Sequence, residues 1–390
     1  MEINGAKMFV KALQEEGVDT LFAYPGGTAI DLFDALYDAE GIDMILPRHE
    51  QALVHAADGY ARSTGRVGVC LVTSGPGATN LVTGIATANY DSVPLVCFTG
   101  QVPMNLIGND AFQEVDIVGI TRSICKYAVT VRKREDLARI IKNAFYIART
   151  GKPGPVVVDI PKDIQLAMGS DEYPSEVNIR GYKPSEGVHV GQIKRALAEL
   201  KNAKKPVFLC GGGVNIAHAR KEMQQLAEKT GIPVVTTIMG KGAIPTDHPL
   251  YVGNIGMHGN LASNKAIMES DVLFSIGCRF NDRITGTIDT FAKNAKIIHV
   301  DIDAASISRN IKVDIPIVAD AKVAISKMLE YAEPLDIKDW VDDIMNVKAE
   351  YPINMNRYDG VTPEAIIRTI NDMYSNLIIT TDVGQNQLWT

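Results

Sequence analysis

The chain has 390 residues, of which 46% are hydrophobic and 22% charged, with a formal net charge of -7 and a pI near 5.6. This length exceeds what one hydrophobic core supports, and the acidic balance argues against nucleic acid or an anionic membrane as the main partner, because both select a basic face. No apolar run approaches the roughly 18 residues that span a bilayer, and residues 1–17 predict an amphipathic helix rather than a signal peptide. We therefore expect a multidomain cytoplasmic protein that acts on small molecules.

The first domain is expected over residues 1–166, where short apolar runs alternate with helical patterns. This alternation predicts parallel βαβ units, and continuously apolar runs fit a sheet that helices cover on both faces. The fold class is therefore α/β, with a doubly wound parallel sheet. The strand candidates are Thr20–Ala23, Asp43–Leu46, Val67–Val72, Leu95–Thr99, Tyr127–Val131 and Val156–Ile160.

A polar stretch that includes Pro174, Ser175, Pro184 and Ser185 predicts a linker over 167–187, and a second α/β domain is expected over 188–331. Its strand Val207–Leu209 leads into the glycine run Gly211–Gly213, and further strands are expected near Val234, Val272 and Ile297. The two domains therefore share one architecture.

Beyond the second domain, the mixed and charged residues 332–361 predict another linker, and residues 362–390 predict the start of a third α/β domain. The third domain is expected to open with a helix over Thr362–Met373 and a strand over Asn376–Thr381.

Two segments at the ends of predicted strands suggest chemistry. Glu50 follows one strand and opens a helix, which is where open α/β sheets bind ligands, although an acidic residue also favours any helix N-terminus. The next strand leads into Thr73-Ser74-Gly75-Pro76-Gly77-Ala78-Thr79-Asn80, whose glycines allow backbone to approach a ligand. Alone, such a loop fits a phosphate site and a plain tight turn about equally.

Six motifs resemble, in order and spacing, the large subunit of acetolactate synthase, over essentially the whole chain. They are YPGG from Tyr24, RHEQ with HAADGYAR, TSGPGATN, DAFQE from Asp110, GKPGPVVVDIPKD from Gly151, and DVGQNQ from Asp382. The resemblance implies a thiamine-diphosphate enzyme that decarboxylates pyruvate and joins the product to pyruvate or 2-oxobutyrate, as the first common step of branched-chain amino-acid biosynthesis.

By this resemblance, Glu50 shares a proton with the cofactor's pyrimidine N1′ and so promotes deprotonation of the thiazolium. Pro76 and Asn80 lie along the pyrimidine, while Gly26 and Gln113 face the reacting atoms, with Gly26 presenting a backbone N–H to developing oxyanion charge. Gly384 and Gln385, in the closing motif, join the cofactor-binding residues.

The resemblance also implies that the middle domain binds FAD as a structural cofactor that the main reaction does not reduce. The implied FAD residues are Lys152, Gly211, Gly212, Gly213, Thr237, Ile238, Gly256, Met257, His258, Gly277, Arg279, Asn281, Arg283, Asp301, Ile302 and Asp320. Many relatives carry arginine in place of Lys152, and lysine lacks the bidentate fork. His258 has no partner histidine at metal-ligand spacing.

Phe112, Lys162, Met257 and Arg283 are the implied substrate-binding residues. Each of the first two has a plainer alternative, namely a core aromatic for Phe112 and a solvated lysine for Lys162, and Arg279 and Arg283 could be surface ion-pair arginines. The five cysteines show no metal or redox spacing and are expected to be buried thiols.

No Gly-Asp-Gly motif with a following Asn occurs, so no metal site is expected within this chain, and the Mg²⁺ site of the family would lie in a C-terminal region that the sequence lacks. We therefore expect this polypeptide to be a truncated and inactive form that still forms a homodimer or homotetramer, with a possible regulatory small subunit. The alternatives are another thiamine-diphosphate decarboxylase or oxidase, or a non-catalytic FAD-binding module. A nicotinamide dehydrogenase is disfavoured, because no Gly-x-Gly-x-x-Gly occurs with the required context.

Overall fold

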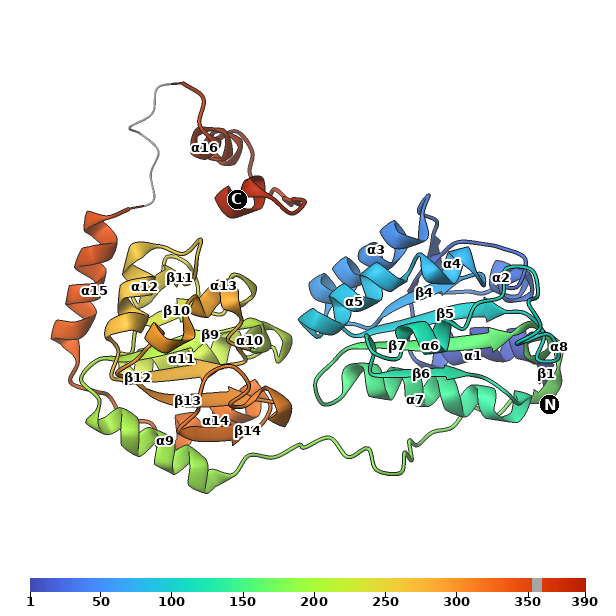
Figure 1. Cartoon of the computed structure of the whole chain (residues 1–390), viewed down its shortest axis with the longest axis horizontal. Helices are drawn as coiled ribbons and strands as arrows, with labels where there is room; N and C mark the ends of the chain where they lie inside the picture. The colour runs from blue at the N-terminus through green and yellow to red at the C-terminus, as the bar shows by residue number, and fades with distance from the viewer. Residues whose placement is uncertain (353–359) are drawn as a thin grey trace. The chain divides into compact units, whose positions relative to one another are not determined.

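A computed structural model describes residues 1–352 and 360–390, which divide into two compact units, Met1–Ser185 and Glu186–Thr390. The expected α/β architecture is confirmed, because each unit contains a six-stranded parallel sheet flanked by helices (Figure 1). Part of the expected linker over 332–361, residues 353–359, lies outside the described residues.

The first unit contains eight strands and the helices between them. Its elements are β1 Glu2–Asn4, α1 Gly5–Glu15, β2 Thr20–Ala23, α2 Ile30–Tyr37, β3 Asp43–Ile45, α3 Glu50–Thr64, β4 Gly68–Val72, α4 Pro76–Thr79, α5 Val82–Asp91, β5 Leu95–Gln101, α6 Ile117–Thr121, β6 Tyr127–Thr130, the 3-10 turn Arg134–Asp136, α7 Leu137–Arg149, β7 Pro155–Pro161, α8 Lys162–Leu166 and β8 Met168–Ser170.

The sheet of the first unit has the strand order β3-β2-β4-β5-β7-β6, with all neighbours parallel. Alternate residues of its strands enter two separate cores. One core lies under α1, α2 and α7 and includes Leu71 and Val158, and the other lies under α3 and α5 and includes Cys70 and Val157 (Figure 1). Burial on both faces explains why β4 and most of β5 and β7 are apolar.

The N-terminal segment corrects one expectation. Residues 2–4 form β1, which pairs antiparallel with β8, and only then does α1 begin at Gly5. A single helix from residue 1 was expected because the apolar residues keep a helical period. The Asn4 side chain accepts a hydrogen bond from Lys7 N, and this cap fixes where the helix starts. The same pairing places a strand inside the expected linker over 167–187, whose Tyr173 and Tyr182 pack on the first unit.

The second unit is built around one core. Its elements are α9 Val190–Asn202, β9 Pro206–Cys210, α10 Gly212–Ile216, α11 Arg220–Thr230, β10 Val234–Thr236, the 3-10 turn Ile238–Gly240, β11 Tyr251–Asn254, α12 Leu261–Glu269, β12 Val272–Ile276, α13 Asp282–Thr285, the 3-10 turn Ile288–Thr290, β13 Lys296–Asp301, the 3-10 turn Ala304–Ser306, β14 Ile315–Val318, α14 Ala321–Tyr331 and α15 Lys338–Glu350.

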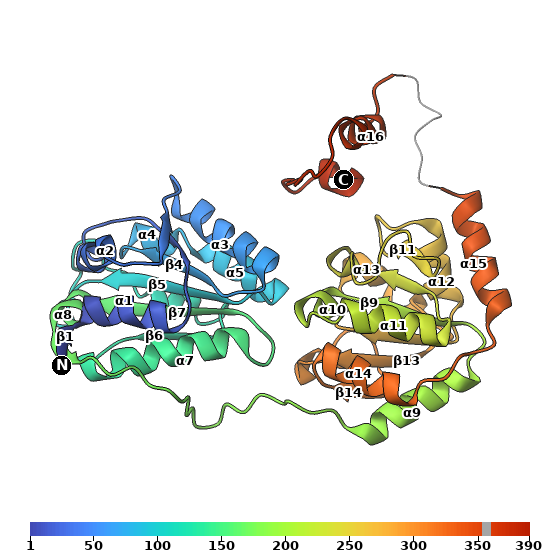
Figure 2. The ribbon, with the colours of Figure 1, turned by 180° about the vertical axis from the view of Figure 1, so that it is seen from behind.

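The sheet of the second unit has the order β11-β10-β9-β12-β13-β14 and is parallel throughout (Figure 2). Helix α14 contacts both α9 and α11, while α12 contacts α15. Trp340 and Ile344 of α15 are buried in the core of this unit, and Trp340 Nε1 donates a hydrogen bond to Pro206 O. This part of the expected linker over 332–361 therefore belongs to the second unit.

Residues 360–390 contain α16 Pro363–Met373 and α17 Gln385–Trp389. The helix expected over Thr362–Met373 is confirmed, with Thr362 as the N-cap whose hydroxyl accepts from Ala365 N. The strand expected over Asn376–Thr381 is wrong, because residues 376–381 are irregular. An apolar run becomes a strand only where a neighbouring strand pairs with it.

Candidate functional site

Loops of the first unit meet between β2 and β4, where the order in which the chain adds strands to the sheet reverses. From β2 the chain runs to β3 on one side, whereas from β4 it runs to β5 on the other side. In open α/β sheets, ligands bind outside the carboxyl ends of the strands at such a switch point. The loop 24–29 after β2 and the loop 73–80 after β4 therefore flank a candidate binding site.

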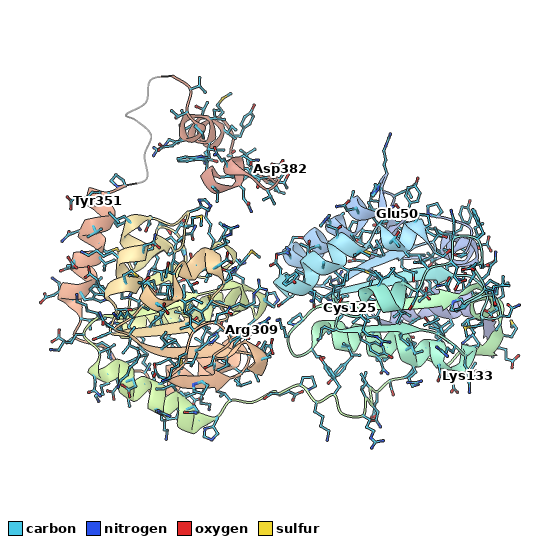
Figure 3. The ribbon with its side chains drawn as sticks, in the orientation of Figure 1. Glu50, Cys125, Lys133, Arg309, Tyr351 and Asp382 are labelled. Atoms are coloured by element: carbon cyan, nitrogen blue, oxygen red, sulfur yellow. The ribbon has the colours of Figure 1, made fainter. Side chains whose placement is uncertain are left out.

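Glu50 lies beside this point, as the first residue of α3 (Figure 3). The His49 side chain caps the helix by accepting a hydrogen bond from Gln51 N, and this fixes where α3 begins. Glu50 Oε2 accepts a hydrogen bond of 2.9 Å from Asn80 Nδ2. The structure thus brings together two predicted cofactor residues that are 30 positions apart in the sequence.

Glycines make room around this carboxylate. A Cβ at Gly77 would lie 3.4 Å from Glu50 Oε1 and 2.8 Å from the Thr73 methyl, and a Cβ at Gly26 would lie 2.6 Å from Thr73. The Gly26 N–H has no hydrogen-bond acceptor among residues 1–352 and 360–390. It is therefore available to a ligand, as expected of a donor to an oxyanion.

Gln113 contacts the same glycine-rich loop, and its backbone has a left-handed conformation that residues other than glycine rarely adopt. Its φ is +55°, and a Cβ at Gly75 would lie 2.5 Å from Gln113 O. The Glu114 carboxylate accepts from Gly108 N and Ala111 N, which closes the loop. Left-handed backbone at a non-glycine residue persists only where its surroundings hold it and is common at functional sites.

Phe112 and Lys162, the predicted substrate residues of the first unit, differ in their surroundings. Phe112 is 84% exposed, which excludes the core-aromatic alternative. Lys162 Nζ lies 3.5 Å from Gly27 O and 3.7 Å from Asp31 Oδ2, and its side chain is only 36% exposed. Lys162 is therefore held against the loop that carries Gly26 and is not a fully solvated lysine.

A buried carboxylate without a predicted role lies near the carboxyl end of β7. Asp159 accepts hydrogen bonds from Thr99 Oγ1 at 2.7 Å, Gln101 Nε2 at 3.1 Å and Thr130 Oγ1 at 3.2 Å. Burial raises the pKa of Asp159 to about 6, although the three hydrogen bonds oppose this shift. Gln101 Nε2 also donates to Val115 O, so the network reaches the loop that carries Gln113.

In the second unit, glycines gather at the centre of the sheet. The strand order places β9 between β10 and β12, so the chain reverses at β9 and β12, which is the dinucleotide-binding arrangement of doubly wound folds. Gly211 follows β9, Gly277 follows β12 with a φ of +62°, and Cβ atoms at Gly211 and Gly213 would lie 2.1 Å from Gly277 O and 2.6 Å from Gly277 Cα. Two backbone segments thus touch where only glycine fits.

The other predicted residues of the second unit lie at or beyond the carboxyl ends of its strands, in loops and in short helical turns. Met257 N donates to Arg283 O at 3.0 Å and Arg283 Nη1 lies 3.9 Å from Met257 Sδ, so these two predicted residues are neighbours. Thr237 caps the 3-10 turn that contains Ile238, and Asp320 Oδ1 accepts from two backbone N–H groups at the start of α14. Met257 and Ile238 are exposed by 65% and 51%.

The remaining predicted residues are distributed over both units. Gly212 packs against Met239, Gly256 has a φ of +111° beside Arg283, and Asp301 Oδ1 accepts from Asp303 N. His258, Arg279, Asn281 and Ile302 lie in the loops after β11, β12 and β13, Lys152 lies in the first unit after α7, and Gly384 and Gln385 lie at the start of α17. Arg283 Nε is 4.0 Å from Asp282 Oδ2 on the surface.

Four cysteines are buried and Cys125 is half-buried, and burial raises the pKa of Cys125 to about 11, as expected of inert thiols. Within residues 1–352 and 360–390, no three His, Cys, Asp or Glu side chains converge as metal ligands. No helix in the same ranges is long and apolar enough to cross a membrane.

Comparison with known proteins identifies the family of this chain. Residues 3–120 match the family described as thiamine pyrophosphate enzyme, N-terminal TPP binding domain, and residues 193–328 match its central domain. The chain is 49% identical to the probable acetolactate synthase large subunit of Methanococcus aeolicus, over 99% of this chain and 68% of that protein. It is 46% identical to the large subunit of Haemophilus influenzae and 45% identical to the isozyme 3 large subunit of Escherichia coli, over 100% and 99% of this chain and 70% and 69% of those proteins. The chain therefore belongs to the acetolactate synthase large-subunit family of thiamine-diphosphate enzymes.

Proposed function

We propose that the first unit holds the pyrimidine ring of thiamine diphosphate and that Glu50 shares a proton with its N1′ nitrogen. The observation that carries this proposal is the Asn80–Glu50 hydrogen bond at the switch point, which leaves Glu50 Oε1 facing Gly77. A half-buried carboxyl group with one oxygen already bonded has its other oxygen in a fixed direction. Positioning of this kind is what proton transfer requires.

The substrates are proposed to be pyruvate and a second 2-oxo acid, pyruvate or 2-oxobutyrate. When bound, thiamine diphosphate supplies the nucleophile and the electron sink for loss of carbon dioxide and for the new carbon–carbon bond. The Gly26 N–H donates to the oxygen on which negative charge develops, and Gln113 faces the same atoms from the opposite loop. Lys162 attracts the carboxylate of the incoming 2-oxo acid, and the exposed Phe112 lines its entrance.

The second unit is proposed to bind FAD as a structural cofactor. Its strand order and the contact of Gly211 and Gly213 with Gly277 support this, since they make the close approach that a dinucleotide needs. Arg279, with its planar guanidinium group, is proposed to bind the dinucleotide, and the adjacent pair Arg283 and Met257 to contact substrate. The flavin takes no part in the proposed main reaction.

Mg²⁺ is proposed to accompany the cofactor's diphosphate, and we assign none of residues 1–352 and 360–390 as its ligand. Gly384 and Gln385 are proposed as further cofactor contacts. The protein is proposed to form a homodimer or homotetramer and to bind a small regulatory subunit, because its relatives are named as large subunits.

The central test replaces Glu50 in the holoenzyme. Glu50→Gln keeps the shape of the side chain but cannot exchange the N1′ proton, so acetolactate formation should fall by about 10²–10⁴-fold. Glu172→Gln makes the same chemical change at an exposed residue outside the site and should leave the rate unchanged. Near-normal turnover of Glu50→Gln would remove Glu50 from the mechanism.

The flavin proposal has its own test. A ligand that binds only the folded state raises its melting temperature by mass action, so saturating FAD should stabilise the apoprotein. Gly277→Ala should abolish this shift, because a Cβ there would lie 2.5 Å from Gly213 Cα. Gly231→Ala is the matched control, since Gly231 also has a positive φ, of +76°, but has open space around its Cβ position. An absence of any shift in the wild-type protein would contradict flavin binding.

A further inference from the structure

The two loops that flank the proposed cofactor site separate where the sheet ladder ends. The last ladder pair of β2 and β4 is Ala23 with Leu71, followed by one hydrogen bond from Tyr24 N to Leu71 O. Beyond this point the chain turns toward β3 from one strand and toward β5 from the other. Backbone pairing therefore does not fix how far the Gly26 loop stands from the loop that flanks Glu50.

Two threonine side chains join these loops beyond the ladder. Thr28 Oγ1 and Thr73 Oγ1 lie 3.0 Å apart, Thr73 Oγ1 accepts from Thr28 N at 3.3 Å, and Thr28 Oγ1 accepts from Ser74 N at 3.0 Å. A hydroxyl group donates one hydrogen bond and accepts two, so both groups can satisfy this arrangement at once. The pair links the backbone of one loop to the backbone of the other.

Thr73 also contacts both parts of the proposed chemistry. Its side chain lies where a Cβ of Gly26 would be, at 2.6 Å, and its methyl group lies 2.8 Å from where a Cβ of Gly77 would be. Gly26 supplies the proposed oxyanion donor, and Gly77 adjoins Glu50 Oε1. Movement of Thr73 would therefore change the separation between that donor and that carboxylate.

The backbone carbonyl of Thr28 is fixed by contacts with α8 and β5. Gln165, which is fully buried on α8, donates from Nε2 to Thr28 O and to Ile160 O, both at 2.8 Å. A Cβ at Gly100 of β5 would lie 2.6 Å from Thr28 O, so the sheet approaches the same peptide closely. Thr28 is thus fixed to the rigid part of the unit and transmits that position to Thr73.

We propose that Thr28 and Thr73 are positioning residues that set the distance between the Gly26 N–H and the Glu50 carboxylate through their shared hydrogen bond. This inference rests on the proposed roles of Gly26 and Glu50. A displacement of about 1 Å at a reacting centre costs about 10²-fold in rate, so a pair that fixes two catalytic groups affects turnover more than affinity. Gln165 supports the pair from the side away from the site.

The test compares isosteric variants in the holoenzyme. Thr28→Val removes the hydroxyl and keeps the shape, and Thr28→Ser keeps the hydroxyl and removes the methyl. We expect Thr28→Val to lower kcat by about 10-fold with KM for pyruvate changed by less than about 3-fold, and Thr28→Ser to remain within about 2-fold of wild type. Thr87→Val, which removes a hydroxyl that donates to Thr83 O on α5, is the matched control and should leave kcat unchanged.

A double-mutant cycle isolates the shared hydrogen bond. If the two hydroxyls act through each other, Thr28→Val with Thr73→Val should be no slower than the slower single variant, whereas independent effects would multiply. Thr28→Ala serves as a second variant without the hydroxyl should the valine variant fold poorly, and rates are taken per folded molecule.

Unchanged kcat in the hydroxyl-free variants, with only a lower melting temperature, would overturn the inference by showing a purely structural pair. The same is true if the serine variant is as slow as the valine variant. Loss of activity in Glu50→Gln alongside a normal Thr28→Val would reject the positioning role and leave the proposed function standing. A normal rate in Glu50→Gln would instead reject the proposed function.

Discussion

Asn80 Nδ2 donates a hydrogen bond of 2.9 Å to Glu50 Oε2, and this single contact joins the loops that follow β3 and β4. Asn80 immediately follows the four-residue helix α4, whose first residue is Pro76, so its backbone is set by a proline at the helix start. The carboxylate is thereby held by a neutral donor and not by a cation. A neutral partner orients Glu50 without placing a positive charge beside it.

Replacing Asn80 should therefore slow turnover without unfolding the protein. Asn80→Leu removes the donor and leaves Glu50 Oε2 unpaired, and we expect kcat to fall by about 10-fold, the order of one lost hydrogen bond to a charged group. Asn80→Gln retains the amide on a longer chain and should recover part of the rate. Steady-state kinetics with a parallel melting curve measure both effects, and an Asn80→Leu enzyme with wild-type kcat would show that the contact is dispensable.

Gly26 is predicted to tolerate no side chain. In Gly26→Ala the new Cβ would lie 2.6 Å from the Thr73 side chain, so the loop must shift, and acetolactate formation should fall by at least about 10²-fold. Gly59→Ala on the exposed face of α3 places its Cβ in open space and should stabilise the helix by about 0.5–1 kcal/mol. Equal activities of the two variants would contradict a constrained Gly26.

Asp159 should make the first unit less stable as the pH rises through the range from about 4 to 6. Its folded-state pKa is about 6, raised by burial above the ordinary value of 3.8. Between these two values the folded chain binds more protons than the unfolded chain, so stability declines with increasing pH and levels off above 6. The shift of about two units corresponds to about 3 kcal/mol.

Asp159→Asn removes this titration, and the Thr99 hydroxyl can turn to accept from the new amide. The difference in unfolding free energy between variant and wild type should therefore increase in the variant's favour from pH 4 to pH 6. Urea unfolding at several pH values measures it, and a pH-independent difference would contradict the raised pKa.

His299 should have the opposite effect in the second unit. Its ring is fully buried at 5.0 Å from the Phe280 ring, with Nε2 at 3.8 Å from Asp301 Oδ2, and burial lowers its pKa from 6.5 to about 4. Between pH 4 and 6.5 the unfolded chain binds more protons, so stability is full above 6.5 and is lost as the pH falls toward 4.

His299→Leu should remove that loss, because leucine does not titrate. Hydrogen exchange of β13 amides at pH 5 and pH 7 would report it within the second unit alone. The wild-type protein should lose protection at pH 5 relative to pH 7, and the variant should lose less. Equal losses in the two proteins would show that His299 is not the titrating group.

The sheets were predictable where burial on both faces imposes a continuous apolar run, as in β4 and β7. The missed strands β11 and β14 lie at sheet edges, where one side of the ladder is open and polar residues such as Asn254 are tolerated. Strand β1 was missed because its three residues form a strand only through pairing with residues 168–170. Long-range pairing of this kind leaves no periodicity to read.

Some residues of the candidate site could likewise be predicted from the sequence, and others could not. Glu50 was singled out at a strand-to-helix junction and Asn80 through the family resemblance, and the structure places their side chains within hydrogen-bond distance. Thr28 and Gln165 were not singled out, because a hydroxyl or amide that bonds to backbone has no characteristic spacing in the sequence. Their partners are set by tertiary approach, which only the structure shows.

The β1–β8 ladder also bears on how the first unit is completed during synthesis. Residues 2–4 lie beside residues 168–170, and Arg134 Nη2 donates to both Ile3 O and Ser170 O. On the ribosome, β1 is made before β8 and has no partner until residues 168–170 have been translated and have left the exit tunnel. The ladder is therefore among the last contacts of the unit to form, and a nascent chain paused before that point would present an unpaired strand to chaperones.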